Sequence, residues 1–277
     1  EPFADSSMIP TCLVSRVAKK YVTVSLSGTG GDELFGGYPH YYQFHVLKKL
    51  NHLPAVIKYL LSHSVEAANL ILKKEVLNKL VTFFGPRQAD HIIYMQLFSY
   101  MFRTKDESID KLAPFDYLMK HFRYNDDITN AMNYDIHEYL PDDLLVKEDR
   151  ASMAVSLETR VPFLDHEFVE FASKISPHFK IKTGQKKYIL KKAFSTVLPK
   201  EILHRPKQGF GVPLNHYFRN ELKDYIYGEI FNFDEFDYYD KNLLKGFWEK
   251  HQSKSSDYSR LFWSILMFNL WFKKWMM

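Results

Sequence analysis

The segment from Val22 to Tyr38, VTVSLSGTGGDELFGGY, constrains the fold more than any other part of the chain. It begins with an alternating β-branched run that is typical of a short buried strand. Five of the chain's eleven glycines then lie between Gly28 and Gly37. Because glycine has no Cβ atom, the backbone can approach a ligand closely and leave its N–H groups pointing outward. We therefore expect a strand that leads into an anion-binding loop, as in an α/β fold.

Asp32 and Glu33 lie directly after the first glycines of this loop. Mg²⁺ prefers one or two carboxylates together with phosphate oxygens and water, so the acidic pair predicts a metal site beside a phosphate. The alternative is an ordinary strand-to-helix connection, in which both carboxylates only favour the positive end of the helix dipole. The pattern matches neither G-x-G-x-x-G nor G-x-x-x-x-G-K-[ST] and predicts no dinucleotide or Walker-type site.

The composition is that of a globular protein that can hold a large core, with 277 residues, 46% of them hydrophobic and 25% charged. The net charge of +4 is small and the lysines are scattered, which argues against a nucleic-acid partner. The single cysteine, Cys12, excludes an internal disulfide and fits a reducing cytoplasm. The most apolar segment, Leu261 to Trp275, is shorter than the roughly 20 residues that span a bilayer, so we expect a core helix and no membrane partner.

The rest of the chain is predicted to be mainly helical. Hydrophobic spacing predicts a helix over residues 9–20, and no second strand is expected between Tyr38 and residue 160. The partners of the first strand are therefore expected upstream of Glu1 or to be missing. Further helices are predicted over residues 41–50, 55–62, 65–80, 89–102 and 128–139.

A second group of charged residues follows Pro141. This proline and the two aspartates after it predict a helix start, and the apolar residues beyond predict a mostly buried helix. Four charged residues are assigned to that helix: Asp149, Arg150, Glu158 and Arg160. Buried charges need partners, so one interpretation is structural ion pairing. The other is that the helix presents a cation and carboxylates to the glycine loop and holds a small amino-acid-like substrate.

A third segment, residues 183–213, combines a helix with a basic loop. The helix is predicted to end at Leu198-Pro199. Its polar face carries lysines that are expected to be solvated, namely Lys186, Lys187, Lys191 and Lys192. After a short helix, Arg205 and Lys207 lie in a loop held by glycines and prolines. Such a loop either closes over a polyphosphate and neutralises charge on a leaving group, or is a basic surface turn.

The chain resembles the synthetase domain of glutamine-hydrolysing asparagine synthetases, and of related amidotransferases from surface-polysaccharide clusters, in three ordered segments. These are SLSGTGGDELFGGY, KEDRASMAVSLETRVPFLDHEF and GQKKYILKKAFSTVLPKEILHRPKQGFGVPL, and the opening EPFADSS is similar as well. The resemblance implies an incomplete α/β domain of the ATP-pyrophosphatase type, dominated by helices. Residues 1–38 would be the remnant of its nucleotide-binding sheet and residues 39–277 a mainly helical part.

The resemblance also implies an activity. ATP would adenylate a carboxylate, typically the side chain of aspartate, and ammonia would displace AMP to give asparagine. The implied site residues are Ser27, Gly28, Thr29 and Gly30 for the nucleotide, Asp32 and Glu33 for Mg²⁺, Asp149 and Arg150 for the substrate, and Lys207 for catalysis. In the family the loop lysine stabilises the adenylate and the departing pyrophosphate, which agrees with the need for positive charge where pyrophosphate leaves.

Two features depart from the family. Thr29 stands where the family usually has an acidic residue, and a hydroxyl cannot carry the same charge, which bears on substrate choice and activity. The pyrophosphate-binding SGG-x-DS loop and the glutaminase domain, which supplies ammonia, do not occur in this chain. We therefore expect the later part of a synthetase, with a homodimer as one implied full-length state. The alternatives are a non-catalytic remnant or interaction protein, and an amidotransferase acting on a surface-polysaccharide sugar.

Overall fold

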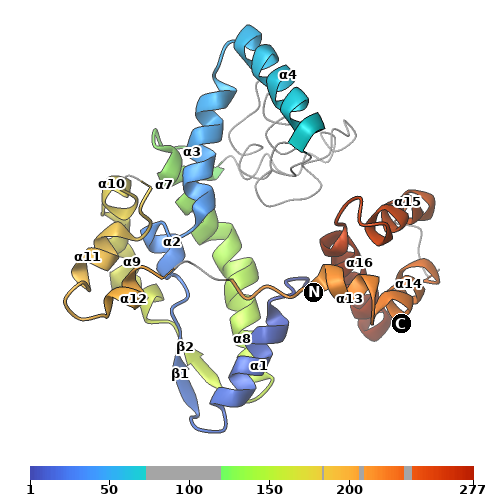
Figure 1. Cartoon of the computed structure of the whole chain (residues 1–277). Coiled ribbons are helices and arrows are strands. Elements are labelled where there is room, and N and C mark those ends of the chain that lie inside the picture. Colours follow the sequence, from blue (N-terminus) through green and yellow to red (C-terminus); the bar gives the residue numbers. More distant parts are fainter. Residues whose placement is uncertain (73–119, 183, 206–208, 234–238) are drawn as a thin grey trace. The chain divides into compact units, whose positions relative to one another are not determined.

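The computed structural model describes residues 1–72, 120–182, 184–205, 209–233 and 239–277 (Figure 1). The chain divides into two compact units, each of which is described by itself. The first unit comprises Glu1–Thr23, Lys147–Leu157 and Gln208–Met277, and the second comprises Val24–Val146 and Glu158–Lys207. No helix among the described residues has the length and apolar character needed to cross a membrane.

The structure is rich in helices, as expected from the sequence. The helices of the first unit are α1 (Met8–Ala18), α13 (Leu214–Arg219), α14 (Lys223–Phe231), α15 (Lys241–Gln252) and α16 (Ser259–Trp275). Those of the second unit are α2 (Gly31–Phe35), α3 (Pro39–Asn51), α4 (Ala55–Leu72), α7 (Asp127–Tyr134), the π-helix η5 (Asp135–Leu145), the 3₁₀-helix η6 (Pro162–Leu164), α9 (His166–Ser173), α10 (Pro177–Lys180), α11 (Tyr188–Ala193) and α12 (Lys200–Leu203). Helix α8 (Val146–Met153) begins at the last residue of one second-unit segment, and its remaining residues belong to the first unit.

Two short strands pair in parallel within the second unit. Strand β1 (Val24–Leu26) lies beside β2 (Glu158–Arg160), with Ser25 opposite Thr159 (Figure 1). The expectation that no second strand precedes residue 160 is therefore wrong, and Glu158 and Arg160 lie on a strand instead of a helix. A three-residue charged segment carries no periodic hydrophobic signal, and its pairing with a strand more than 100 residues earlier is visible only in the folded chain.

The exposure of β1 differs from the expected buried strand. Val24 and Leu26 are both exposed, Leu26 to 74%, and only Ser25 between them is partly buried. β-branched residues favour extended backbone whether or not the strand is covered, so the strand itself was predictable and its burial was not.

Several predicted helices are confirmed, and others begin or end elsewhere. Helices α1, α3 and α16 match their predicted ranges closely. The helix predicted over residues 89–102 and the end of that over residues 65–80 lie outside the described residues. Pro141 does not start a helix, because the helical run begins at Asp127 and Pro141 lies inside η5. Proline lacks the N–H that an α-helix needs, and the wider turns of a π-helix are where the chain accommodates it.

The helix predicted to reach Leu198 ends at Ala193. Phe194, Val197 and Leu198 are exposed, so no packing supports a further turn. The hydroxyl of Ser195 donates to the carbonyl of Lys192 at 2.8 Å, a local bond that competes with helix continuation.

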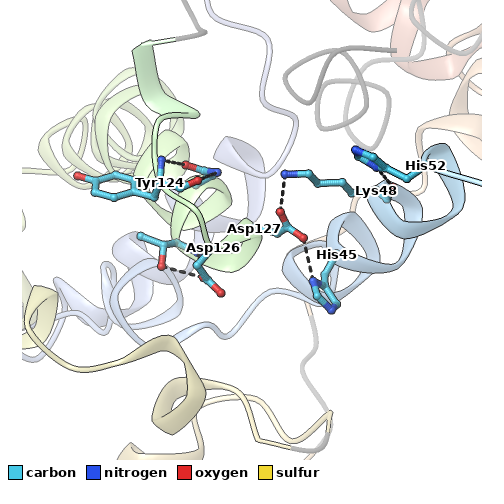
Figure 2. Close-up of polar contacts among 8 residues, drawn as sticks. His45, Lys48, His52, Tyr124, Asp126 and Asp127 are labelled. Carbon is cyan, nitrogen blue, oxygen red and sulfur yellow. Dashed lines mark hydrogen bonds and ion pairs between the residues drawn. The ribbon is translucent and has the colours of Figure 1, made fainter. Parts of the chain in front are cut away.

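A hydrophobic core and polar contacts join α3 to α7 in the second unit. Tyr41, Phe44 and Leu47 of α3 pack with Ala131 and Met132 of α7. Figure 2 shows the polar edge of this contact, where the Asp127 carboxylate lies 2.9 Å from His45 Nδ1 and 2.7 Å from Lys48 Nζ. At the start of α7, the side chain of Asp126 accepts the Thr129 N–H at 2.7 Å, which caps the helix.

A second core in the same unit supports α2. Leu34 and Phe35 are almost fully buried with Ala172 of α9, and Phe163 of η6 and Phe168 of α9 pack around them. Because α2 follows the glycine loop directly, this core determines where the loop's last residues lie.

The first unit is built around the helices of the C-terminal segment. Phe218 of α13, Ile226 of α14 and Phe262 of α16 are fully buried. The opening segment of the chain is held by hydrogen bonds, because Trp263 Nε1 donates to the Ala4 carbonyl at 2.9 Å and Lys147 Nζ lies 2.9 Å from the Asp5 carboxylate. The opening EPFADSS is thus an integral part of this unit.

Candidate functional site

The glycine loop connects β1 to α2 and has a defined shape. The Ser27 N–H donates to the Arg160 carbonyl at 2.8 Å, which prolongs the pairing of the two strands. The Ser27 hydroxyl lies 3.0 Å from the Thr29 hydroxyl and accepts the Thr29 N–H at 3.2 Å. At Gly28 a Cβ atom would meet nothing within 4 Å, so the backbone is open there. Gly30 has a φ of +90° and lies against the Leu164 side chain, and only glycine fits both conditions.

Asp32, in the first turn of α2, is paired with a lysine from a distant segment. Its Oδ1 lies 3.1 Å from Lys187 Nζ, and both side chains are about a quarter exposed (23% and 29%). Both side chains lie close to Gly37, because a Cβ atom at that position would collide with the Asp32 carboxylate and with Lys187 Cε. Lys187 itself has a φ of +53°, a left-handed conformation that costs a non-glycine residue free energy.

The prediction of a solvated Lys187 is therefore wrong. Its sequence position places it beside three other lysines, and nothing local distinguishes it from them. Only the folded chain brings it to Asp32, 155 positions earlier in the numbering.

Glu33 points into the protein, unlike Asp32. It is 1% exposed, and the Tyr38 hydroxyl donates to its Oε1 at 2.5 Å. Burial raises the pKa of Glu33, helped by the negative charges of Asp32 and Asp135 and opposed by the hydrogen bond from Tyr38. Burial and the neighbouring Glu33 charge also raise the pKa of the Tyr38 hydroxyl, which keeps it a hydrogen-bond donor.

The Tyr38 ring is held in place by its neighbours. It stacks on His40 with ring centroids 4.9 Å apart and meets the edge of Tyr139 at 6.1 Å. His40 Nε2 in turn lies 3.0 Å from the carboxylate of Asp135, which is completely buried at the start of η5. The contacts from Glu33 through Tyr38 and His40 to Asp135 form a polar network that had no signal in the sequence beyond its residue types.

Lys180, at the end of α10, is a buried cation near the loop. Only 6% of its surface is exposed, and its Cβ lies 3.7 Å from the position that a Gly36 Cβ would take. It has no ion pair or side-chain hydrogen bond with any described residue. Burial alone lowers the pKa of Lys180 to about 8.

We expect Lys180→Met to stabilise the protein. Methionine has a similar volume and carries no charge to desolvate, so we expect the free energy of unfolding at pH 7 to rise by about 1 kcal/mol. In the native protein the folded state binds fewer protons than the unfolded chain between the folded pKa of about 8 and the ordinary value of 10.5. The free energy of unfolding should therefore rise as the pH rises from about 8 to about 10.5. It should be lowest below this window, where Lys180 is protonated in both states.

Urea unfolding at pH 7, 8.5 and 10 measures both effects. The Lys180→Met variant should lose this pH dependence, whereas Lys186→Met makes the same charge change at a neighbouring, less buried lysine and should leave the pH dependence intact. A destabilised Lys180→Met variant with unchanged pH dependence would contradict the prediction.

The remaining predicted site residues are placed as follows. Asp149 and Arg150 lie on α8 in the first unit and are both exposed. Since Ala151 and Ser152 are its buried residues, α8 is not the mostly buried helix that was expected. Arg150 Nη2 is 3.6 Å from Glu1 Oε1, a contact between two well-exposed groups. Lys207 lies outside the described residues. The structure thus brings Ser27 to Gly30, Asp32 and Glu33 together in one unit.

The residues around the loop fit a nucleotide with Mg²⁺. The described residues contain no group of three or more His, Cys, Asp or Glu side chains able to hold a metal ion. Mg²⁺ does not require one, because it commonly takes one or two carboxylates and completes its coordination with phosphate oxygens and water. Asp32 is a partly exposed carboxylate directly after a glycine loop, which is the kind of donor this arrangement needs.

Comparison with known proteins identifies the family of the chain. A profile of the family described as Asparagine synthase matches residues 1–273. The chain is 35% identical over 289 residues to asparagine synthetase [glutamine-hydrolyzing] 1 of Bacillus subtilis, covering 98% of this chain and 43% of that protein. It is 33% identical over 282 residues to a putative asparagine synthetase [glutamine-hydrolyzing] of Mycobacterium bovis, covering 98% of this chain and 42% of that protein.

The same comparisons define the extent of the similarity. Asparagine synthetase [glutamine-hydrolyzing] 3 of Bacillus subtilis is 30% identical over 213 residues, or 77% of this chain. The chain spans less than half the length of these curated relatives. No solved structure matches. Since the family profile covers nearly every residue and the glycine loop has the expected form, the chain belongs to the asparagine synthase family.

Proposed function

We propose that this chain forms the later part of an ATP-dependent synthetase domain of the ATP-pyrophosphatase type. The domain would adenylate a carboxylate, typically that of aspartate, releasing pyrophosphate, and ammonia derived from glutamine would then displace AMP to give asparagine. The observation that carries the proposal is the loop from Ser27 to Gly30, placed between β1 and α2 with the Asp32 carboxylate beside it. The cytoplasm is the proposed location.

The residues of the second unit have distinct roles in this proposal. The open backbone at Gly28 and the two hydroxyls of Ser27 and Thr29 would bind the nucleotide. The acidic pair at the start of α2 would supply the Mg²⁺ ligand, and the ion when bound would neutralise phosphate charge. Lys187, whose Nζ lies 3.1 Å from Asp32, would add positive charge next to this carboxylate.

Residues elsewhere complete the proposed reaction. Asp149 and Arg150 would bind the substrate, since a carboxylate and a guanidinium can pair with the amino and carboxyl groups of an amino acid. Lys207 would stabilise the negative charge that develops on the departing pyrophosphate. Both roles are carried over from the resemblance.

One observation favours the alternative of a non-catalytic remnant. In the described part of the chain the sheet has two strands of three residues each, and Val24 and Leu26 are exposed on it. An isolated pair of short strands is marginally stable in water. The remnant interpretation therefore predicts that the chain neither binds Mg·ATP nor supports turnover.

Pyrophosphate release tests the proposal directly. The purified chain, and a chimaera that joins it to the preceding half of Bacillus subtilis asparagine synthetase 1, would be given ATP, MgCl₂, ¹⁵N-ammonium and one carboxylate at a time. We expect pyrophosphate to form only when ATP and an accepted carboxylate are both present, and ¹⁵N-asparagine to appear when the carboxylate is aspartate. Reactions without the carboxylate control for simple ATP hydrolysis.

The other outcomes separate the alternatives. Product from a uronic acid but not from aspartate would favour an amidotransferase acting on a sugar. Absence of pyrophosphate with every carboxylate, together with absence of Mg·ATP binding, would overturn the enzyme proposal and support the remnant.

A further inference from the structure

The two carboxylates of the acidic pair face different surroundings. Successive residues of an α-helix point about 100° apart, so neighbours on α2 can meet different surroundings. Asp32 is partly exposed and lies on Lys187, whereas Glu33 is 1% exposed and accepts the Tyr38 hydroxyl at 2.5 Å. For Glu33 to join Asp32 on one metal ion, its carboxylate would have to leave both its buried position and this short hydrogen bond.

Two hydrogen bonds close the same turn of the chain. The Gly37 N–H donates to the Asp32 carbonyl at 2.8 Å. The next residue after each of these also forms a hydrogen bond, because the Tyr38 hydroxyl donates to the Glu33 carboxylate. The two residues just before Tyr38 are both glycine, Gly36 and Gly37, so this part of the chain has little intrinsic rigidity. The side-chain bond therefore acts together with the backbone bond in holding this turn.

Tyr38 can hold Glu33 only because its own ring is fixed. His40 stacks on one face of the ring at 4.9 Å, with an angle of 16° between the planes, and Tyr139 contacts it edge-on. His40 is bonded to the fully buried Asp135 of η5. Through His40, the Tyr38 ring is thus linked to η5, which lies outside the loop. This contact fixes the position of the turn.

We propose that Tyr38 is a positioning residue of this site, which holds Glu33 inside the protein so that Asp32 alone of the acidic pair faces the nucleotide and its Mg²⁺. The inference rests on the proposed function for the identity of the ligand. It differs from the expectation that Asp32 and Glu33 both bind the metal, because here Glu33 stays buried and holds the turn through its hydrogen bond with Tyr38.

Conservative substitutions separate the two arrangements. Glu33→Gln keeps an oxygen that can accept the Tyr38 hydroxyl, so we expect the Mg²⁺ concentration for half-maximal pyrophosphate release to change by less than about twofold. Asp32→Asn removes the metal-binding charge and should raise that concentration by more than tenfold. If both carboxylates bound the metal, the two variants would behave alike, and that result would overturn the proposal.

Tyr38→Phe tests the positioning role itself. The variant keeps the ring and loses the hydroxyl, and we expect it to raise the half-maximal Mg²⁺ concentration three- to tenfold. Tyr42→Phe is the matched control, because it removes the same hydroxyl from a tyrosine that is half exposed on α3. A Tyr38→Phe variant that is less stable but has an unchanged Mg²⁺ requirement would show a merely structural role and contradict the proposal.

A binding measurement keeps this test separate from the proposed function. Mn²⁺ in the presence of ATP, followed by electron paramagnetic resonance, reports the metal site without turnover. Binding that depends on Asp32 and Tyr38 but not on Glu33, in a protein that releases no pyrophosphate, would uphold this inference and reject the proposed reaction. Absence of Mn²⁺ binding in the unmodified protein would overturn both.

Discussion

Replacing Lys207 with alanine is expected to reduce ATP- and carboxylate-dependent pyrophosphate release by about 10²- to 10³-fold or more. Removing one preorganised donor from a developing negative charge typically costs that much in turnover. In the sequence, Lys207 has another cation two residues before it, Arg205, and is followed by Gly209, Gly211 and Pro213. The loss should appear in kcat with a smaller change in KM for ATP, because the charge that Lys207 stabilises develops only as pyrophosphate leaves.

Two further variants make the result specific to the lysine. Lys207→Arg retains the positive charge and should recover part of the activity, although a guanidinium does not reproduce the compact geometry of an ammonium. Lys200→Ala removes an exposed lysine from α12 and should have no effect. Unchanged turnover in Lys207→Ala would remove this residue from the mechanism.

Replacing Gly37 with alanine is expected to displace the Asp32 carboxylate and abolish most of the activity. The new Cβ atom would overlap the Asp32 carboxylate and Lys187 Cε, so the ion pair must break or the turn must move. Both groups are ends of flexible, partly exposed side chains that can move aside, so we expect the free energy of unfolding to fall by about 1 kcal/mol, the lower end of what overpacking costs. The displaced Asp32 carboxylate should also lose its place beside the nucleotide, so we expect little or no pyrophosphate release.

Urea unfolding and the pyrophosphate assay would measure both consequences. Gly28→Ala is a matched control in the same loop, since a Cβ there meets nothing within 4 Å and its φ is not in the left-handed region. We expect it to keep its stability. A Gly37→Ala protein as stable as Gly28→Ala and as active as the unmodified protein would mean that the Asp32–Lys187 pair does not occupy the space described here.

The helices were the most predictable part of the fold. In α1, α3 and α16, apolar residues recur at the period of a helix over three or more turns, and proline opens α3 at its first position. Such patterns are local, because each residue's face depends only on its neighbours along the helix. Helix ends were less predictable, as α11 shows: its apolar residues continue past Ala193, but Phe194, Val197 and Leu198 are exposed.

The candidate site was predictable in its residue types but not in its contacts. The glycine loop and the acidic pair follow from VTVSLSGTGGDELFGGY, since only glycines allow the close backbone approach and the positive φ seen at Gly30. The sequence treats Asp32 and Glu33 as equivalent neighbours. Their separation into a partly exposed and a buried carboxylate depends on Lys187 and Tyr38, and on the aromatic and acidic residues that fix Tyr38.

What the sequence determined by itself was therefore the family, the loop and the positions of the strongly periodic helices, because motif order and local periodicity are properties of the linear chain. The tertiary structure alone decided the pairing of β1 with β2, the ion pair of Asp32 with Lys187 and the burial of Lys180. Each of these joins or covers residues far apart in the sequence. Their stability comes from desolvation and pairing that exist only once the chain has folded.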